Sequence, residues 1–98
     1  MSFQLRITSL AENDISNAAL WYNEKSLGLG KEFLDSIELA FSIITQNPHL
    51  FQDRYKNVKI IFTTRFPYGI YYIIEENQLI ILAVLHTKMD EMVWKDRL

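Results

Sequence analysis

The segment YGIYYIIEENQLIILAVLH, residues 68–86, decides how this chain folds. It contains two apolar runs, 68–75 and 78–86, whose richness in isoleucine, valine and tyrosine is typical of strands. Glu76 and Asn77 lie between the runs, and two residues are enough for a tight hairpin turn in which asparagine tolerates a positive φ. The segment therefore predicts a β-hairpin.

Two helices are predicted upstream of this hairpin. Ser9 and Glu12 match a capping box, so we expect the first helix to begin near Leu10. Each helix carries an apolar stripe at spacings of three and four residues. The stripes consist of Ala11, Ile15, Ala18 and Tyr22 in the first helix, and of Phe33, Ile37, Ala40 and Ile44 in the second. Asn47 and Pro48 end the second helix, because proline cannot continue one.

Two more strands and a short last helix complete the predicted architecture. Alternation over residues 3–7 predicts a strand, the run 58–64 predicts another, and 48–57 is predicted to be a loop. Asp90 is placed to cap a last helix of about two turns. The 98 residues then form one α+β domain of order β-α-α-β-β-β-(α), with the helix hairpin packed on one face of an antiparallel sheet.

Composition excludes several classes of function. The chain has no cysteine, which excludes disulfides, thiolate metal sites and cysteine nucleophiles. Neither histidine has a partner at ligand spacing, so we expect no metal and no cofactor. We also expect a cytoplasmic protein with no membrane contact, because the sequence has no secretory signal and no apolar run of about 20 residues.

Charge argues against direct, specific DNA binding, because the formal net charge is −2. The distribution is uneven, however, and the span 54–65 contains cations and no acid. These cations are Arg54, Lys56, Lys59 and Arg65. The span is either a solvated loop and strand edge or a patch that faces an anion or a partner.

Both faces of the predicted hairpin are apolar. Successive side chains of a strand point to opposite sides of the sheet. In the first strand Tyr68, Ile70, Tyr72 and Ile74 oppose Tyr71 and Ile73; in the second, Leu79, Ile81, Ala83 and Leu85 oppose Ile80, Leu82 and Val84. The helix hairpin can cover one face, and only a short tail is left for the other. Either Met92, Val93 and Trp94 cover that second face, or another chain does, and we favour another chain.

Residues 65–86, RFPYGIYYIIEENQLIILAVLH, resemble a segment of the RelE/ParE toxins, also called plasmid stabilisation proteins. The shared features are an FPY-x-[IL]-Y-Y strand, an acidic turn and an apolar strand ending in histidine. Further similarities are Ala11-x-x-Asp14 and Trp21-Tyr22 in the first helix, Gly30-x-x-Phe33-Leu34 and Asn47-Pro48 in the second, and Trp94-x-x-Arg97 in the tail. The resemblance covers nearly the whole chain, and the fold of this family has the predicted order of elements.

The resemblance implies the toxin of a type II toxin–antitoxin system, neutralised by a cognate antitoxin that wraps around it. The oligomer could be a homodimer or a toxin–antitoxin heterotetramer. Toxins of the ParE branch act on DNA gyrase, whereas those of the RelE branch cleave mRNA on the ribosome. RelE-like ribonucleases usually have arginine where this chain has Gly69, a second arginine near Lys88, and tyrosine near Trp94. Glycine has no side chain to offer, and indole cannot serve as an acid or a base.

These departures favour ParE-like inhibition of DNA gyrase by binding, without catalysis. A ribosome-dependent mRNA endoribonuclease and a degenerate, non-toxic partner-binding member are the alternatives. If the protein is a ribonuclease, the candidate catalytic residues are His86, Lys88 and Arg65, although we favour a strand-end histidine bonded to backbone as the role of His86. The candidate antitoxin-binding residues are Ile61, Tyr68, Tyr71, Tyr72, Ile73 and Trp94. The candidate target-binding residues are Arg65, Lys88, Trp94 and Arg97.

Overall fold

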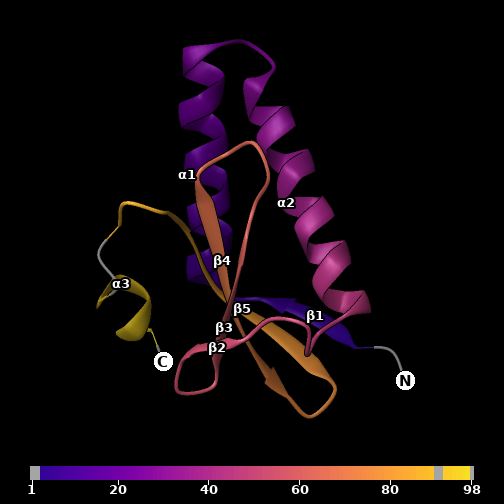
Figure 1. Cartoon of the computed structure of the whole chain (residues 1–98). Helices are drawn as coiled ribbons and strands as arrows, with labels where there is room; N and C mark the ends of the chain where they lie inside the picture. Colours follow the sequence, from indigo (N-terminus) through magenta and orange to yellow (C-terminus); the bar gives the residue numbers. More distant parts are fainter. Residues whose placement is uncertain (1–2, 90–91, 98) are drawn as a thin grey trace.

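The computed structural model describes residues 3–89 and 92–97 as two helices packed on a five-stranded sheet, followed by a short last helix (Figure 1). Its elements are β1 (Gln4–Ile7), α1 (Ser9–Lys25), α2 (Leu29–Gln46), β2 (Asp53–Tyr55), β3 (Val58–Phe62), β4 (Tyr68–Glu75), β5 (Gln78–His86) and α3 (Met92–Lys95). The predicted α+β class is confirmed, and β4 and β5 have the predicted bounds. Asp90, the predicted cap of the last helix, lies outside the described residues.

The strands are ordered β1-β5-β4-β3-β2 across the sheet. Strands β3, β4 and β5 pair antiparallel, as predicted, and β2 pairs antiparallel with β3. Strand β1 runs parallel to β5, so the sheet is mixed. The helix hairpin carries the chain from one edge of the sheet to the other, which leaves β1 free to pair with the last strand. Strand β2 occupies part of the predicted loop 48–57, and its three exposed residues have no apolar alternation that could signal a strand.

Helix α1 begins one residue earlier than predicted. Its N-cap is Thr8, whose side-chain oxygen accepts a hydrogen bond of 3.2 Å from the backbone N–H of Ala11. That amide is one of the N–H groups a helix start leaves without a backbone partner. Helix α2 ends at Gln46 before Asn47 and Pro48, as predicted.

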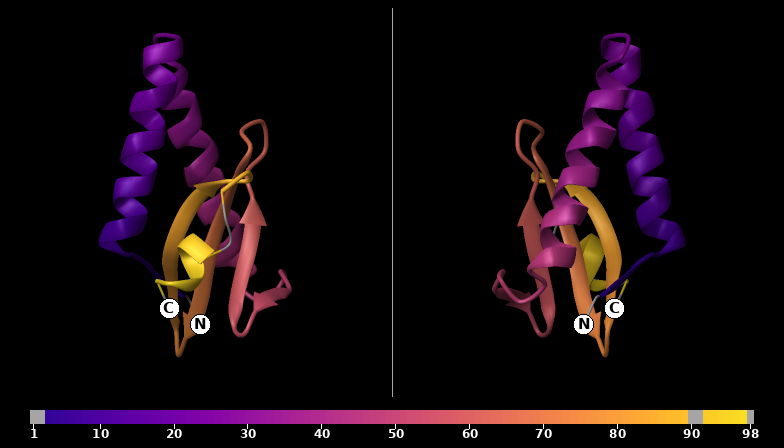
Figure 2. Two further views of the ribbon diagram at one scale, coloured as in Figure 1. Left: turned by 90° about the vertical axis from the view of Figure 1, so that its left-hand side faces the viewer. Right: turned by 90° about the vertical axis from the view of Figure 1, so that its right-hand side faces the viewer.

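The two helices pack closely along their small residues and lie together on one side of the sheet (Figure 2). A Cβ on Gly30 of α2 would lie 2.5 Å from the backbone oxygen of Ala19 in α1, so glycine is required at this contact. The predicted stripes face inward. Their fully buried members are Ala11 and Ala18 of α1, and Phe33, Ile37, Ala40 and Ile44 of α2.

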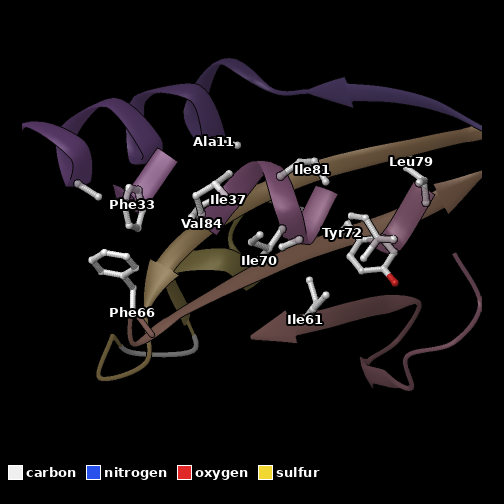
Figure 3. Packing of buried hydrophobic residues seen from close by; sticks show 13 residues of the cluster. Ala11, Phe33, Ile37, Ile61, Phe66, Ile70, Tyr72, Leu79, Ile81 and Val84 are labelled. Carbon is white, nitrogen blue, oxygen red and sulfur yellow. The ribbon is translucent and has the colours of Figure 1, made fainter. Parts of the chain in front are cut away.

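The helices and the sheet enclose the larger of two apolar clusters, here called the helix-face core (Figure 3). Its buried strand residues include Ile61, Ile70, Tyr72, Leu79, Ile81 and Val84. Tyr72 is fully buried, and its hydroxyl donates a hydrogen bond of 3.1 Å to the backbone oxygen of Pro48. This bond ties the end of α2 to the middle of the sheet.

A β-bulge at Leu82 changes the alternation of β5. Tyr71 pairs with Ala83 but Tyr72 pairs with Ile81, so Leu82 is an extra residue on its strand. Val84 consequently faces the helices, and Ala83 faces the opposite side with Leu82. The prediction that Ala83 and Leu85 share a face with Leu79 and Ile81 is therefore wrong. An extra residue inside a continuous apolar run leaves no mark in the sequence pattern.

The C-terminal segment covers the second face of the sheet. It forms a second cluster, here called the tail-face core, with Val58, Ile80, Leu82, Ala83, Leu85 and Trp94 buried. Trp94 is 1% exposed and stacks on Tyr71, with ring centroids 5.0 Å apart and planes at 22°. Its edge also meets Tyr55 at 5.7 Å. The tail thus covers the part of this face around Tyr71, because one flat-lying indole covers far more area than a four-residue helix suggests. Phe62 of β3, on the same face, stays 52% exposed.

Candidate functional site

A groove of about 660 Å³ lies between α1 and the adjacent ends of β4 and β5. Helix α1 forms one wall, and the other is formed by the start of β4 and the segment that ends β5. The lining residues are Asp14, Asn17, Ala18, Trp21, Tyr22, Pro67, Tyr68, Val84, Leu85, His86 and Met89. The helix hairpin extends beyond the sheet at this end (Figure 1), which is why the layers separate here.

The α1 wall follows from helical spacing. Asp14, Asn17, Ala18 and Trp21 recur at intervals of three and four residues, which places them on one face of the helix. Trp21 is 52% exposed, and across the groove Met89 is 51% exposed. Large apolar side chains this open to solvent, gathered in one concave surface, are typical of a site that binds a partner or a ligand.

The closed end of the groove is aromatic. The ring of Tyr22 lies 6.1 Å from that of Tyr68 and 4.9 Å from that of Phe66. Burial raises the pKa of Tyr22. Burial also raises the pKa of Tyr68, and the nearby Tyr22 and Asp14 raise it further. Both phenols are therefore neutral at physiological pH and can donate hydrogen bonds to an occupant.

His86 lies on the β5 side of the groove. Its Nδ1 accepts a hydrogen bond of 3.1 Å from the backbone N–H of Lys88. Its ring meets Tyr68 edge-on at 5.4 Å. The arrangement matches the expected strand-end histidine bonded to backbone.

An ion pair ties the tail to the same region. Asp14 accepts from the Arg97 guanidinium through both oxygens, at 2.6 Å and 3.1 Å, and also from the backbone N–H of Val84 at 3.0 Å. Arg97 donates a further bond of 3.1 Å to the carbonyl of Leu82. Because β1 ends opposite Ile81, these side chains complete the outer edge of β5 where no strand continues. Arg97, a predicted target-binding residue, therefore has a structural partner within the chain.

The candidate catalytic residues do not gather in one cluster. Arg65 forms an ion pair of 2.6 Å with Glu32 of α2, and its guanidinium lies over the ring of Phe66. His86 instead faces α1 across the groove, and Lys88 is exposed just beyond it. The arrangement brings His86 and Lys88 together but directs Arg65 toward a different element.

The predicted antitoxin-binding residues separate into three groups. Tyr68 lines the groove, as described above. Tyr71 and Ile73 are half-buried at the tail-face core, where Tyr71 stacks under Trp94. Ile61, Tyr72 and Trp94 are buried in the cores, at 5%, 0% and 1% exposure, and in this conformation they have almost no surface to offer a partner. Trp94 is also a predicted target-binding residue, and its burial leaves equally little surface for contact with a target.

Most of the groove does not follow from the sequence pattern. Asp14 and Trp21 were noticed only as parts of motifs, although their seven-residue separation on a predicted helix already places them on one face. Trp21 also lies off the apolar stripe, and a large aromatic residue there could have indicated an open surface. Met89 had no such signal, because its position depends on how the chain leaves β5.

The described residues also bear on metal binding and membrane insertion. Within residues 3–89 and 92–97, no three histidine or carboxylate side chains lie close enough to hold a metal ion. Within the same residues, no helix has both the length and the apolar character needed to cross a membrane.

The fold and the groove define a small α+β domain of the RelE/ParE type. A structure from the chromosomal ParDE toxin–antitoxin system of P. aeruginosa has a TM-score of 0.70 and 16% identity, with 87% of this chain and 96% of that chain covered. A chain of the toxin–antitoxin complex RelBE2 from Mycobacterium tuberculosis has a TM-score of 0.62 and 17% identity, with coverage of 88% and 99%. No curated protein sequence matches significantly.

The family follows from the sequence match. The model of the ParE toxin of type II toxin–antitoxin systems, parDE, matches residues 5–91. The chain therefore belongs to the ParE toxin family, which confirms the family expected from residues 65–86.

Proposed function

We propose that this protein inhibits DNA gyrase by binding to it, and that a cognate antitoxin neutralises it by placing an apolar segment in the groove beside α1. The observation that carries the proposal is the groove itself. It is mainly apolar and aromatic, it is open, and its rim carries the exposed side chains of Trp21 and Met89. Such a groove suits the apolar face of a helix or an extended peptide. Gyrase acts on DNA in the cytoplasm, so we place the toxin there too.

The geometry around Gly69 supports a binding toxin over a ribonuclease. This residue is buried, and a Cβ added to it would lie 3.0 Å from Cδ1 of Ile60. An arginine there would have to displace that side chain. Nδ1 of His86 already accepts a hydrogen bond from the backbone N–H of Lys88, and Arg65 is paired with Glu32. General acid–base cleavage of RNA needs a base, an acid and cations aimed at one phosphate.

One observation favours the RelE-like alternative. His86 lines the groove beside Tyr68, and the exposed Lys88 follows two residues later. A histidine, a phenol and an ammonium group at one end of a groove could in principle serve as base, donor and phosphate contact. The alternative therefore has specific residues that can be tested.

The two functions separate in a paired assay. Purified protein should inhibit supercoiling by gyrase at micromolar concentration and leave mRNA on programmed ribosomes intact. The substitutions His86→Ala and Lys88→Ala should not create or remove any RNA cleavage. Absence of gyrase inhibition, together with A-site cleavage that either substitution abolishes, would contradict the proposal and establish the RelE-like function.

Antitoxin docking has its own test with a matched control. The Trp21→Ala variant should bind an antitoxin encoded by an adjacent reading frame more weakly than the wild type does. Leu20→Ala is the control, because Leu20 is the preceding residue of α1, is 65% exposed and does not line the groove. Truncating a central aromatic contact typically costs at least 2 kcal/mol of binding, roughly thirtyfold in Kd. Equal affinity of the two variants would show that the antitoxin binds elsewhere.

A further inference from the structure

The groove has one carboxylate among its lining residues, and the C-terminal tail neutralises it. Asp14 has both oxygens within hydrogen-bond distance of the Arg97 guanidinium and receives the Val84 N–H as well. The two charged side chains are only 14% and 15% exposed. While the tail is docked, Asp14 therefore has its negative charge matched at contact distance and has little capacity left for an occupant.

Two exposed cations lie next to the groove, one at each side. Lys25 lies one helical turn beyond Trp21, with its Nζ 4.9 Å from the centre of the indole ring. Lys88 is exposed two residues after His86 at the opposite side. An apolar floor with a cation near each wall is complementary to an apolar segment whose flanking residues are acidic.

We propose that Arg97 determines the charge preference of the groove: with the tail docked, the groove selects an apolar partner segment flanked by glutamate or aspartate. This inference rests on the proposed docking of the antitoxin in the groove, and it specifies the chemistry of that partner. If Arg97 withdraws, Asp14 keeps only the Val84 N–H and becomes an uncompensated anion in the wall. The groove then repels acidic flanks, so the docked state of the tail controls which segments bind.

The test uses two synthetic helical peptides that share one apolar face and carry either four glutamates or four lysines at the flanking positions. Binding to the full chain is measured by fluorescence anisotropy of the labelled peptide at low salt. The wild type should prefer the glutamate peptide. Arg97→Gln should lower the affinity for the glutamate peptide by about tenfold and raise the affinity for the lysine peptide. Both effects should become smaller at high salt.

Two further variants separate charge from folding. Lys31→Gln is the control, because it removes one positive charge from an exposed ion pair with Asp35 on α2, and it should leave both affinities unchanged. Asp14→Asn combined with Arg97→Gln removes the anion and its partner together, so the preference for glutamate should return. This restoration would not follow if Arg97→Gln merely disrupted the fold.

The outcomes are distinct. Failure of both peptides to bind the wild type would overturn groove docking, and the inference with it. A glutamate preference that survives Arg97→Gln, or one that the double variant fails to restore, would overturn the role of Arg97 while leaving groove docking in place. Loss in the single variant and recovery in the double variant would establish it.

Discussion

The two faces of the sheet are buried by very different means. Helices of 17 and 18 residues cover one face, and many interlocking side chains form the helix-face core. A four-residue helix covers the other face, where Trp94 and the pair formed by Asp14 and Arg97 hold the tail in place. The same sheet thus has one cover that depends on area and another that depends on a few specific contacts.

This difference shows that an apolar sheet face does not by itself identify a binding surface. The helices cover one face and the tail covers the part of the other face around Tyr71, although Phe62 at the β3 side of that second face stays 52% exposed. A concave apolar surface lies instead where the helix hairpin extends past the sheet. The exposed side chains of Trp21 and Met89 mark that place. The following substitutions test how unequal the two covers are.

The largest effect should come from the helix-face core. Phe33→Ala removes a fully buried ring that stacks on Tyr22 and meets Phe66 and Tyr68 edge-on. The free energy of unfolding should fall by about 3 to 5 kcal/mol, as for other buried aromatic truncations. Urea denaturation followed by circular dichroism measures it. A loss below about 1 kcal/mol would mean that the helices contribute far less than their packing indicates.

Alkaline pH should act on the same core through Tyr72. Burial, and to a smaller extent the charge of Asp53, raises the pKa of Tyr72 to about 12. A phenol with a higher pKa in the folded state stabilises the protein below the unfolded value near 10 and loses that contribution as pH rises through 12. The loss should approach about 2 to 3 kcal/mol.

The Tyr72→Phe variant provides the control for this pH effect. It should be less stable at neutral pH by about 1 kcal/mol, because the hydrogen bond to Pro48 is lost. It should also lose less stability than the wild type between pH 10 and pH 12. Identical pH profiles of the two proteins would contradict the assignment to Tyr72.

In the tail, Arg97→Gln should lower the free energy of unfolding by about 2 kcal/mol. This loss is smaller than for a fully buried ion pair, because both side chains retain some solvent contact. Lys31→Gln, in an exposed pair, should change stability by less than about 0.5 kcal/mol. Denaturation midpoints measure both. Equal effects of the two substitutions would show that the ion pair between Asp14 and Arg97 does not hold the tail in place.

A small net effect should come from Trp94→Phe in the tail-face core. Within the described residues, the buried Nε1 of Trp94 has no hydrogen-bond partner. Phenylalanine removes that unsatisfied donor and gives up some contact area, and these changes oppose each other. We expect a net change within about 1 kcal/mol, measured by urea denaturation. A loss above about 3 kcal/mol would show that the indole shape itself is essential to the cover.

Local patterns predicted the elements well because each depends on neighbouring residues. The bounds of β4 and β5, the inward stripe of α2 and its end before Pro48 all follow from periodicity and proline geometry. The turn was placed correctly, but the positive φ, 54°, falls on Glu76 and not on Asn77.

What the sequence did not predict depends on contacts between distant residues. The bulge at Leu82, the bond between Asp14 and Arg97 across 83 positions, and the stacking of Trp94 on Tyr71 all require the assembled sheet. The groove is a product of these contacts, because its walls come from α1 and from the end of β5. A pattern along one segment cannot show which of two apolar faces the tail will cover.

The central claim is that the groove is open and that the tail closes the second face of the sheet around Tyr71, and the two tryptophans of the chain report on one region each. In Trp94→Phe the remaining Trp21 reports on the groove, and in Trp21→Phe the remaining Trp94 reports on the tail face. Acrylamide quenching should be strong for Trp21, which is 52% exposed, and weak for Trp94, which is 1% exposed. Equal quenching of the two would contradict the account, because the second face would then be open in solution.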